Sequence, residues 1–183
     1  GDFDDYSFTL AKESEVLIEV FSHRMNLPTD PHLFLYKSVK KDGTAERQFI
    51  GESDDTNPKV GGTAYSTAHR DPLYKLKADA DVTYIVTIGN RYQTAGLDSM
   101  YRLVLRKPQA DFNLLAHHAP PLADPKKITL SGTSIVGAGR ICFTIEAERC
   151  DGFDGAIQIE TQGLPEDFLA HPCTIPKGSN KGL

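Results

Sequence analysis

Apolar and polar residues alternate in short segments along most of this chain, with the period expected of half-buried β-strands. The segment "EVLIEVFS" (15–22) also fits a helix, because Val16, Leu17, Val20 and Phe21 would share one helical face. Its β-branched content and its strand-like neighbours favour a strand. The strands predicted up to residue 108 are 6–10, 15–22, 32–39, 47–53, 73–78, 82–90 and 100–107. Seven or eight short strands separated by turn residues predict an all-β domain, an antiparallel β-sandwich.

The pattern changes at residues 108–125, where proline is concentrated and the alternation is lost. Three further strands are predicted at 126–130, 140–149 and 155–161. In the second of these, the apolar face consists of Ile141, Phe143, Ile145 and Ala147. The polar face consists of Cys142, Thr144, Glu146 and Glu148. Three or four strands bury little surface by themselves. We therefore predict a domain at 1–108, a Pro-rich linker at 109–125, and a partial unit at 126–183. This unit either packs on the first domain or is completed by strands of a longer parent protein.

Composition is that of an ordinary globular protein, with 39% hydrophobic and 25% charged residues. The net charge of −5, from 25 acidic and 20 basic residues, argues against a nucleic-acid surface. No apolar run approaches the length of a membrane helix, so membrane insertion is not expected. The sequence opens at Gly1 beside its first predicted strand, as an excised fragment would, so the lack of a signal peptide carries no weight.

Three cysteines, Cys142, Cys150 and Cys173, lie near the end of the chain. Cys142 and Cys150 are eight residues apart along one predicted strand, about 26 Å at strand rise. Because the Cα atoms of a disulfide lie within about 7 Å of each other, these two cysteines are not expected to pair. Two possibilities remain: Cys173 forms a disulfide with one of them, or all three thiols are without a role. The spacing does not indicate a zinc site.

Adjacent acidic residues provide the main candidate for a metal site. Asp54 and Asp55, with Asn57 beside them, lie in a Gly- and Asp-rich loop and offer the oxygen ligands that calcium prefers. A solvated acidic turn is the competing interpretation, since the regular spacing of a dedicated calcium loop is missing. Asp30 and Asp71 each precede a proline, where a short carboxylate bonds nearby backbone amides. We interpret both as turn residues.

Two tyrosines, Tyr65 and Tyr92, are flanked by loop residues and are the candidate ligand-binding aromatics, with a glycan as one ligand that would stack on them. Catalytic residues are not predicted. The six histidines are scattered, and there is no Gly-x-Ser-x-Gly motif. The adjacent pair His117-His118 is interpreted as part of an exposed polar linker.

The first 108 residues resemble the bacterial pre-peptidase C-terminal domain family. The resemblance rests on the order and spacing of "DDYSFTLAKESEVLIEV", "LPTDPHLFLY", "GESDD", "DPLYKLKADADVTYIVTIGNRY" and "YRLVLRKP". The later stretch "ERCDGFDGAIQIETQGLPEDF" is similar to the immunoglobulin-like repeats that often follow such modules. The family's fold is a β-sandwich with jelly-roll character. Some relatives bind calcium through a segment ahead of the first strand, and almost nothing precedes Tyr6 here, so that site is not carried over.

The resemblance implies a non-catalytic accessory, binding or spacer module of a secreted, periplasmic or cell-surface bacterial protein. Its expected partners are other domains of the parent protein, and a glycan or protein substrate. The alternatives are a calcium-stabilised structural spacer, with calcium as the one candidate cofactor, and a carbohydrate-binding module.

Overall fold

A computed structural model describes residues 3–58, 60–61, 67–92, 99–118, 137 and 139–182. The chain divides into two compact units, which we describe separately. The first unit consists of Gly1–Asn57 and Ala68–Pro108, and the second of Pro58–Thr67 and Gln109–Leu183.

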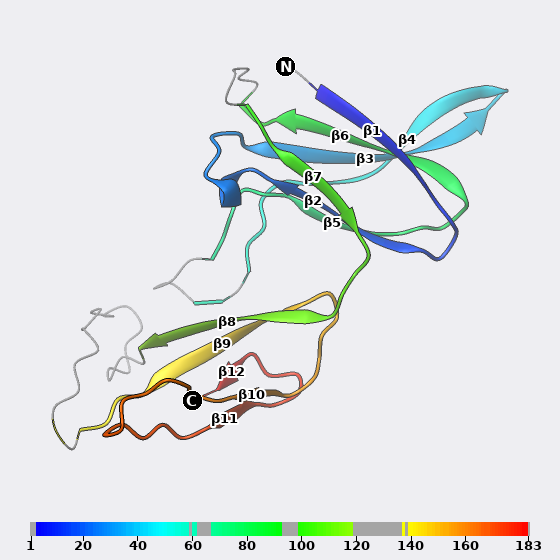
Figure 1. Cartoon of the computed structure of the whole chain (residues 1–183). Helices are drawn as coiled ribbons and strands as arrows, with labels where there is room; N and C mark the ends of the chain where they lie inside the picture. Colours follow the sequence, from blue (N-terminus) through cyan, green and yellow to red (C-terminus); the bar gives the residue numbers. More distant parts are fainter. Residues whose placement is uncertain are drawn as a thin grey trace. The chain divides into compact units, whose positions relative to one another are not determined.

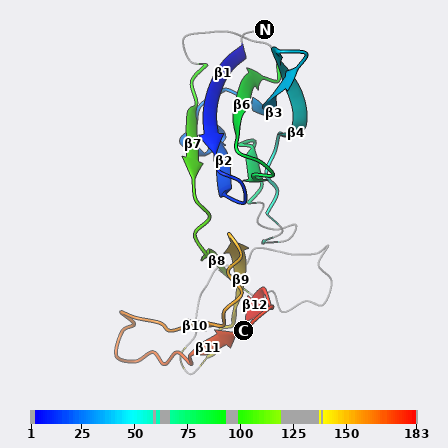
Figure 2. The same cartoon turned by 90° about the vertical axis from the view of Figure 1, so that its right-hand side faces the viewer.

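The first unit is an antiparallel sandwich of two sheets (Figure 1). The four-stranded sheet has the order β1-β6-β3-β4, and Figure 2 shows β6 between β1 and β3. The three-stranded sheet has the order β5-β2-β7. The strands are β1 (Phe3–Leu10), β2 (Glu15–Phe21), β3 (Pro31–Lys41), β4 (Thr44–Ser53), β5 (Leu73–Lys77), β6 (Val82–Asn90) and β7 (Arg102–Arg106). A 3₁₀ turn, η1 (His23–Met25), follows β2.

The predicted sandwich is confirmed. Most consecutive strands of the first unit belong to opposite sheets, and this crossing between sheets is the jelly-roll character expected of the fold. Among the described residues, no helix is long and apolar enough to cross a membrane.

Alternating side chains fill the space between the two sheets. Leu33 and Leu35 of β3, and Tyr84 and Val86 of β6, are fully buried, because residues two apart on a strand project to the same face. The buried cluster also includes Val16, Ile18, Val20, Leu76, Ala78 and Ile88. The period-2 pattern of the sequence therefore places one side of each sheet in a shared core.

Strands β3 and β4 form a long hairpin around Asp42-Gly43. Both turn residues have positive φ, 52° and 81°, which suits an Asp-Gly pair in a tight hairpin turn. The register shifts between Leu35 and Tyr36, so the hairpin contains an irregularity before it reaches Leu33 opposite Ser53. The far end of this hairpin therefore brings the residues before β3 close to the residues after β4.

The second unit contains β8 (Asp111–His118), β9 (Phe143–Cys150), β10 (Ile157–Ile159), β11 (Cys173–Ile175) and β12 (Lys181–Gly182). Its sheets have the orders β12-β9-β8 and β10-β11. Ala147, Ile157 and Ile175 form a small buried core. The predicted linker at 109–125 is wrong for residues 111–118, because these form β8 and pair with β9 along its whole length. The strand predicted at 126–130 lies outside the described residues.

The predicted faces of residues 140–149 are also partly wrong. Glu146, assigned to the polar face, is buried next to buried Ala147, whereas Phe143 from the apolar face is 42% exposed. The reason is that Glu146 has bonding partners on neighbouring segments, which stabilise a buried carboxylate. Cys142, Cys150 and Cys173 are not joined by a disulfide bond, so the possible pairing of Cys173 is not observed.

Candidate metal centre

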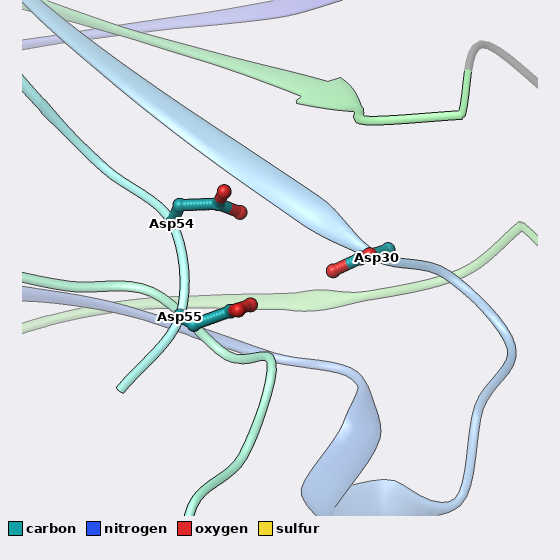
Figure 3. Close-up of side chains that lie close together, drawn as sticks. All are labelled: Asp30, Asp54 and Asp55. Carbon is teal, nitrogen blue, oxygen red and sulfur yellow. The ribbon is translucent and has the colours of Figure 1, made fainter. Parts of the chain in front are cut away.

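Three carboxylates converge at the open end of the β3–β4 hairpin. Asp30 directly precedes β3, and Asp54 and Asp55 directly follow β4. The antiparallel register fixes these positions at the same end of the sheet. One oxygen from each carboxylate lies within 4.8 Å of an oxygen of the others, and Figure 3 shows the three side chains directed toward a common space.

Asp30 is the buried member of this group. Its exposed fraction is 3%, and Asp54 is half-buried, whereas Asp55 is exposed. Among the described residues, Oδ1 of Asp30 and Oδ1 of Asp54 are buried without a hydrogen-bond partner. A buried carboxylate oxygen that bonds nothing is costly, and native proteins usually give it a donor or a cation.

Two arginines supply part of the compensating charge. Nη1 of Arg91 contacts Oδ2 of Asp54, and Nη1 of Arg70 lies 4.0 Å from Oδ2 of Asp30. Both guanidinium groups are more than half exposed. The backbone N–H of Arg91 also donates to the carbonyl of Asp30 at 2.9 Å, so β6 is attached to the same place. Two guanidinium groups beside three carboxylates leave the site with a net negative charge. Both arginines contact Oδ2 atoms, so the Oδ1 atoms of Asp30 and Asp54 keep no partner among the residues that the structure describes.

This arrangement suits a hard divalent cation. Calcium binds six to eight oxygen ligands, commonly aspartate carboxylates and backbone carbonyls, at distances of about 2.3–2.6 Å. A cation between the three side chains would use the two Oδ1 atoms that lack partners. It would also relieve the repulsion between carboxylates that the two arginines compensate only in part.

Of the predicted metal ligands, Asp54 and Asp55 do belong to one group of carboxylates. Asn57 is exposed, two residues beyond Asp55, and stays a predicted ligand. The interpretation of Asp30 as an amide-bonding turn residue is wrong for its Oδ1 atom, which has no such partner in the described part of the chain. The signal that would have found Asp30 was the hairpin itself, because the Asp42-Gly43 turn predicts which strand ends meet.

Asp71 does act as the structural carboxylate that the sequence suggested. It is fully buried, and its Oδ1 accepts the backbone N–H groups of Ser22 at 2.8 Å and His23 at 2.7 Å. Its Oδ2 accepts the backbone N–H of Arg24 at 3.0 Å and its Nε at 2.7 Å. Burial raises the pKa of Asp71, but the Arg24 guanidinium and the three amides outweigh it and hold the pKa below its ordinary value. The carboxylate thus anchors the η1 turn.

Of the two candidate tyrosines, only Tyr92 lies in the part of the chain that the structure describes. Tyr92 is 62% exposed, directly after Arg91 at the end of β6. Tyr65 lies outside the described residues. Both stay predicted ligand contacts.

A second charged group lies in the second unit, around buried Glu146. Its carboxylate accepts the backbone N–H of Gly61 at 2.9 Å and contacts His117 Nε2 at 3.2 Å and Lys181 Nζ at 3.1 Å. Burial raises the pKa of Glu146, but the Gly61 amide, Lys181 and His117 outweigh it and lower the pKa. The interpretation of His117 as exposed linker is therefore wrong. The group binds β8, β9, β12 and the Gly61 segment together.

The chain matches no protein-family model, no curated protein and no solved structure.

Proposed function

We propose that this chain is a non-catalytic accessory module of a secreted, periplasmic or cell-surface bacterial protein, in which a calcium ion at Asp30, Asp54 and Asp55 fixes the first unit. The resemblance to pre-peptidase C-terminal domains and the sandwich fold support an accessory role. The partial immunoglobulin-like character of residues 126–183 belongs to the same proposal. The partners of such a module are other domains of the parent protein.

The buried Oδ1 atom of Asp30 carries the metal part of this proposal. A solvated acidic turn explains Asp55, which is exposed, but it does not explain a 3% exposed carboxylate that points at two others. A bound cation supplies the missing partner of Asp30 and of Asp54 at once.

The geometry of the three carboxylates favours cation binding over acid–base catalysis. Glycosidase carboxylates stand about 5–9.5 Å apart so that a sugar bond fits between them. Here the oxygens approach within 4.8 Å of one another, and Asp54 is already paired with Arg91. The contact between His117 and Glu146 is shared with Lys181 and the Gly61 amide, so this glutamate acts as an anchor. A cation at Asp30 would join the start of β3 to the segment after β4, which is a structural effect.

Thermal unfolding of the calcium-stripped chain, with and without added calcium, tests the proposal. Calcium at 100 times its dissociation constant stabilises the folded state by about 2.7 kcal/mol. For a unit of about 100 residues this raises the midpoint by about 10–20 °C. Asp30→Asn should abolish the shift. In chelator the same variant should unfold at or above the wild-type midpoint, because it removes a buried negative charge that Arg70, at 4.0 Å, compensates only in part.

Asp42→Asn is the matched control, since Asp42 is an exposed hairpin residue with positive φ, a conformation that asparagine tolerates. This variant should keep the full calcium response. An unfolding midpoint that ignores calcium in the wild-type chain would refute the metal site and leave the three carboxylates as a cluster balanced by the two arginines.

A further inference from the structure

The outward face of the four-stranded sheet has a composition unusual for a surface exposed to water. Leu33 and Leu35 of β3 are fully buried, so the residues between and beside them project away from the core. These residues are His32, Phe34 and Tyr36. All three are half-buried rather than fully covered.

Two phenylalanines extend this set across the sheet. Phe49 of β4 stands opposite Tyr36 in the register, and the two ring centroids are 5.6 Å apart in an edge-to-face arrangement. At the other edge, Phe3 of β1 lies over Gly89 of β6, where an added Cβ would be 2.5 Å from the ring. Gly89 in turn stands opposite His32.

We call Phe3, His32, Phe34, Tyr36 and Phe49 the aromatic row. The His32 and Phe34 rings are stacked with centroids 4.2 Å apart. Phe3 and Phe49 are 56% and 54% exposed, which is high for phenylalanine. Three strand spacings of about 4.8 Å separate β1 from β4, so the row spans about 14 Å.

The charges beside the aromatic row compensate one another. Arg47 Nη2 bonds Asp5 Oδ2 at 2.7 Å, and the same carboxylate accepts the Thr87 hydroxyl at 2.5 Å. His32 Nε2 lies 3.2 Å from Glu52. The charged groups next to the aromatic row, Arg47, Asp5 and Glu52, all lie against partners of opposite or neutral character. Lys40, farther along β3 on the same face, lies outside the row. The row therefore complements an uncharged ligand. A nucleic acid or an anionic lipid surface would require unpaired basic side chains here.

We propose that the aromatic row is a binding site for a neutral polysaccharide. The C–H faces of sugar rings pack on flat aromatic side chains, and the sugar hydroxyl groups bond the Arg47–Asp5 pair, which joins β4 to β1 across the same face, and the His32–Glu52 pair. A row that crosses an open sheet favours several successive sugar units over a single sugar in a pocket. The row begins at His32, two residues after Asp30, and none of its five side chains belongs to the group of three carboxylates.

Retention of the whole chain on cellulose and chitin particles, together with its mobility in gels containing xyloglucan, laminarin or galactomannan, tests the site. We expect retardation by at least one of these neutral polymers. Phe49→Ala should weaken the binding at least tenfold, and Phe3→Ala should weaken it too. Phe168→Ala is the matched control, because Phe168 is 48% exposed and lies outside the row. It should bind as the wild-type chain does.

Three outcomes would overturn the proposal. One is that the chain is neither retained on cellulose or chitin particles nor retarded in gels by any of the three soluble polymers. Another is retardation that both Phe49→Ala and Phe3→Ala leave unchanged, which would place the ligand elsewhere. The third is concentration-dependent dimerisation in sedimentation that Phe49→Ala abolishes without any polymer binding, which would make the row a contact between two copies. Matching unfolding midpoints for the variants would show that a loss of binding is not a loss of fold.

Discussion

Asp71→Asn is the substitution whose cost follows most directly from the structure. The carboxylate accepts four hydrogen bonds, two on each oxygen, from Ser22, His23 and Arg24. Asparagine keeps one acceptor oxygen and turns an NH₂ group toward two of these donors. Two bonds are lost, and two donors at the η1 turn face another donor.

The magnitude can be worked from the burial of this carboxylate. A hydrogen bond to a charged group contributes about 1.5–3 kcal/mol, and breaking a buried pair costs about 3–5 kcal/mol. We therefore expect Asp71→Asn to lower the free energy of unfolding of the first unit by about 3–5 kcal/mol. This is a large share of the free energy of unfolding of a typical domain, which is roughly 5–15 kcal/mol. Urea unfolding of the wild-type chain and of the variant measures this difference in free energy, provided that both show the same dependence of the free energy of unfolding on urea concentration.

Asp79→Asn is the control for burial. Asp79 bonds Lys37 at 2.7 Å, the same length as the Arg24–Asp71 contact, but its side chain is 64% exposed. Water screens an exposed ion pair, and the amide oxygen of asparagine can still accept the Tyr84 hydroxyl that Asp79 accepts at 3.2 Å, so this variant should be nearly neutral. Equal costs for the two variants, or a cost below about 1 kcal/mol for Asp71→Asn, would refute the argument from burial.

Acid provides an independent check on Asp71. Its pKa is lower in the folded chain than in the unfolded chain, where an aspartate has a pKa of about 3.9. The folded state therefore gains stability from this group above about pH 4, and loses it as the pH falls through the folded-state pKa. Asp71→Asn should have a flatter stability profile than the wild-type chain between about pH 5 and pH 2. Parallel profiles would contradict the assignment.

Three further predictions follow from other contacts. Glu146→Gln should destabilise the second unit by about 2–4 kcal/mol, because a buried anion with several partners is neutralised; hydrogen exchange of the β9 amides measures the loss. Arg91→Gln should raise calcium affinity at least several-fold in titration calorimetry, because the guanidinium competes for Asp54; unchanged or weaker binding would show that it does not. Leu35→Ala should cost about 2–5 kcal/mol in urea unfolding of the first unit, since the side chain is fully buried.

Local patterns alone were enough to predict the β-sandwich. Alternation along β3 and β6 places every second residue in the core, and the Asp42-Gly43 pair marks the hairpin turn. Both signals act between residues close together in the sequence, so they can be read without knowledge of the fold. Strand β8 was missed because its residues alternate weakly, and its pairing partner β9 begins 25 residues after it ends.

The candidate site depended on contacts between distant segments. Asp54 and Asp55 were recognisable as an acidic pair, but the partner Asp30 is specified by the register of a hairpin more than twenty residues long. Asp71 likewise could be recognised as a turn residue, whereas its amide donors come from a segment 47 to 49 residues away. The sequence by itself determined which residues alternate, turn and carry charge. The tertiary structure decided which carboxylates are buried and which donors reach them, because burial and hydrogen bonding depend on the segments that pack around each side chain.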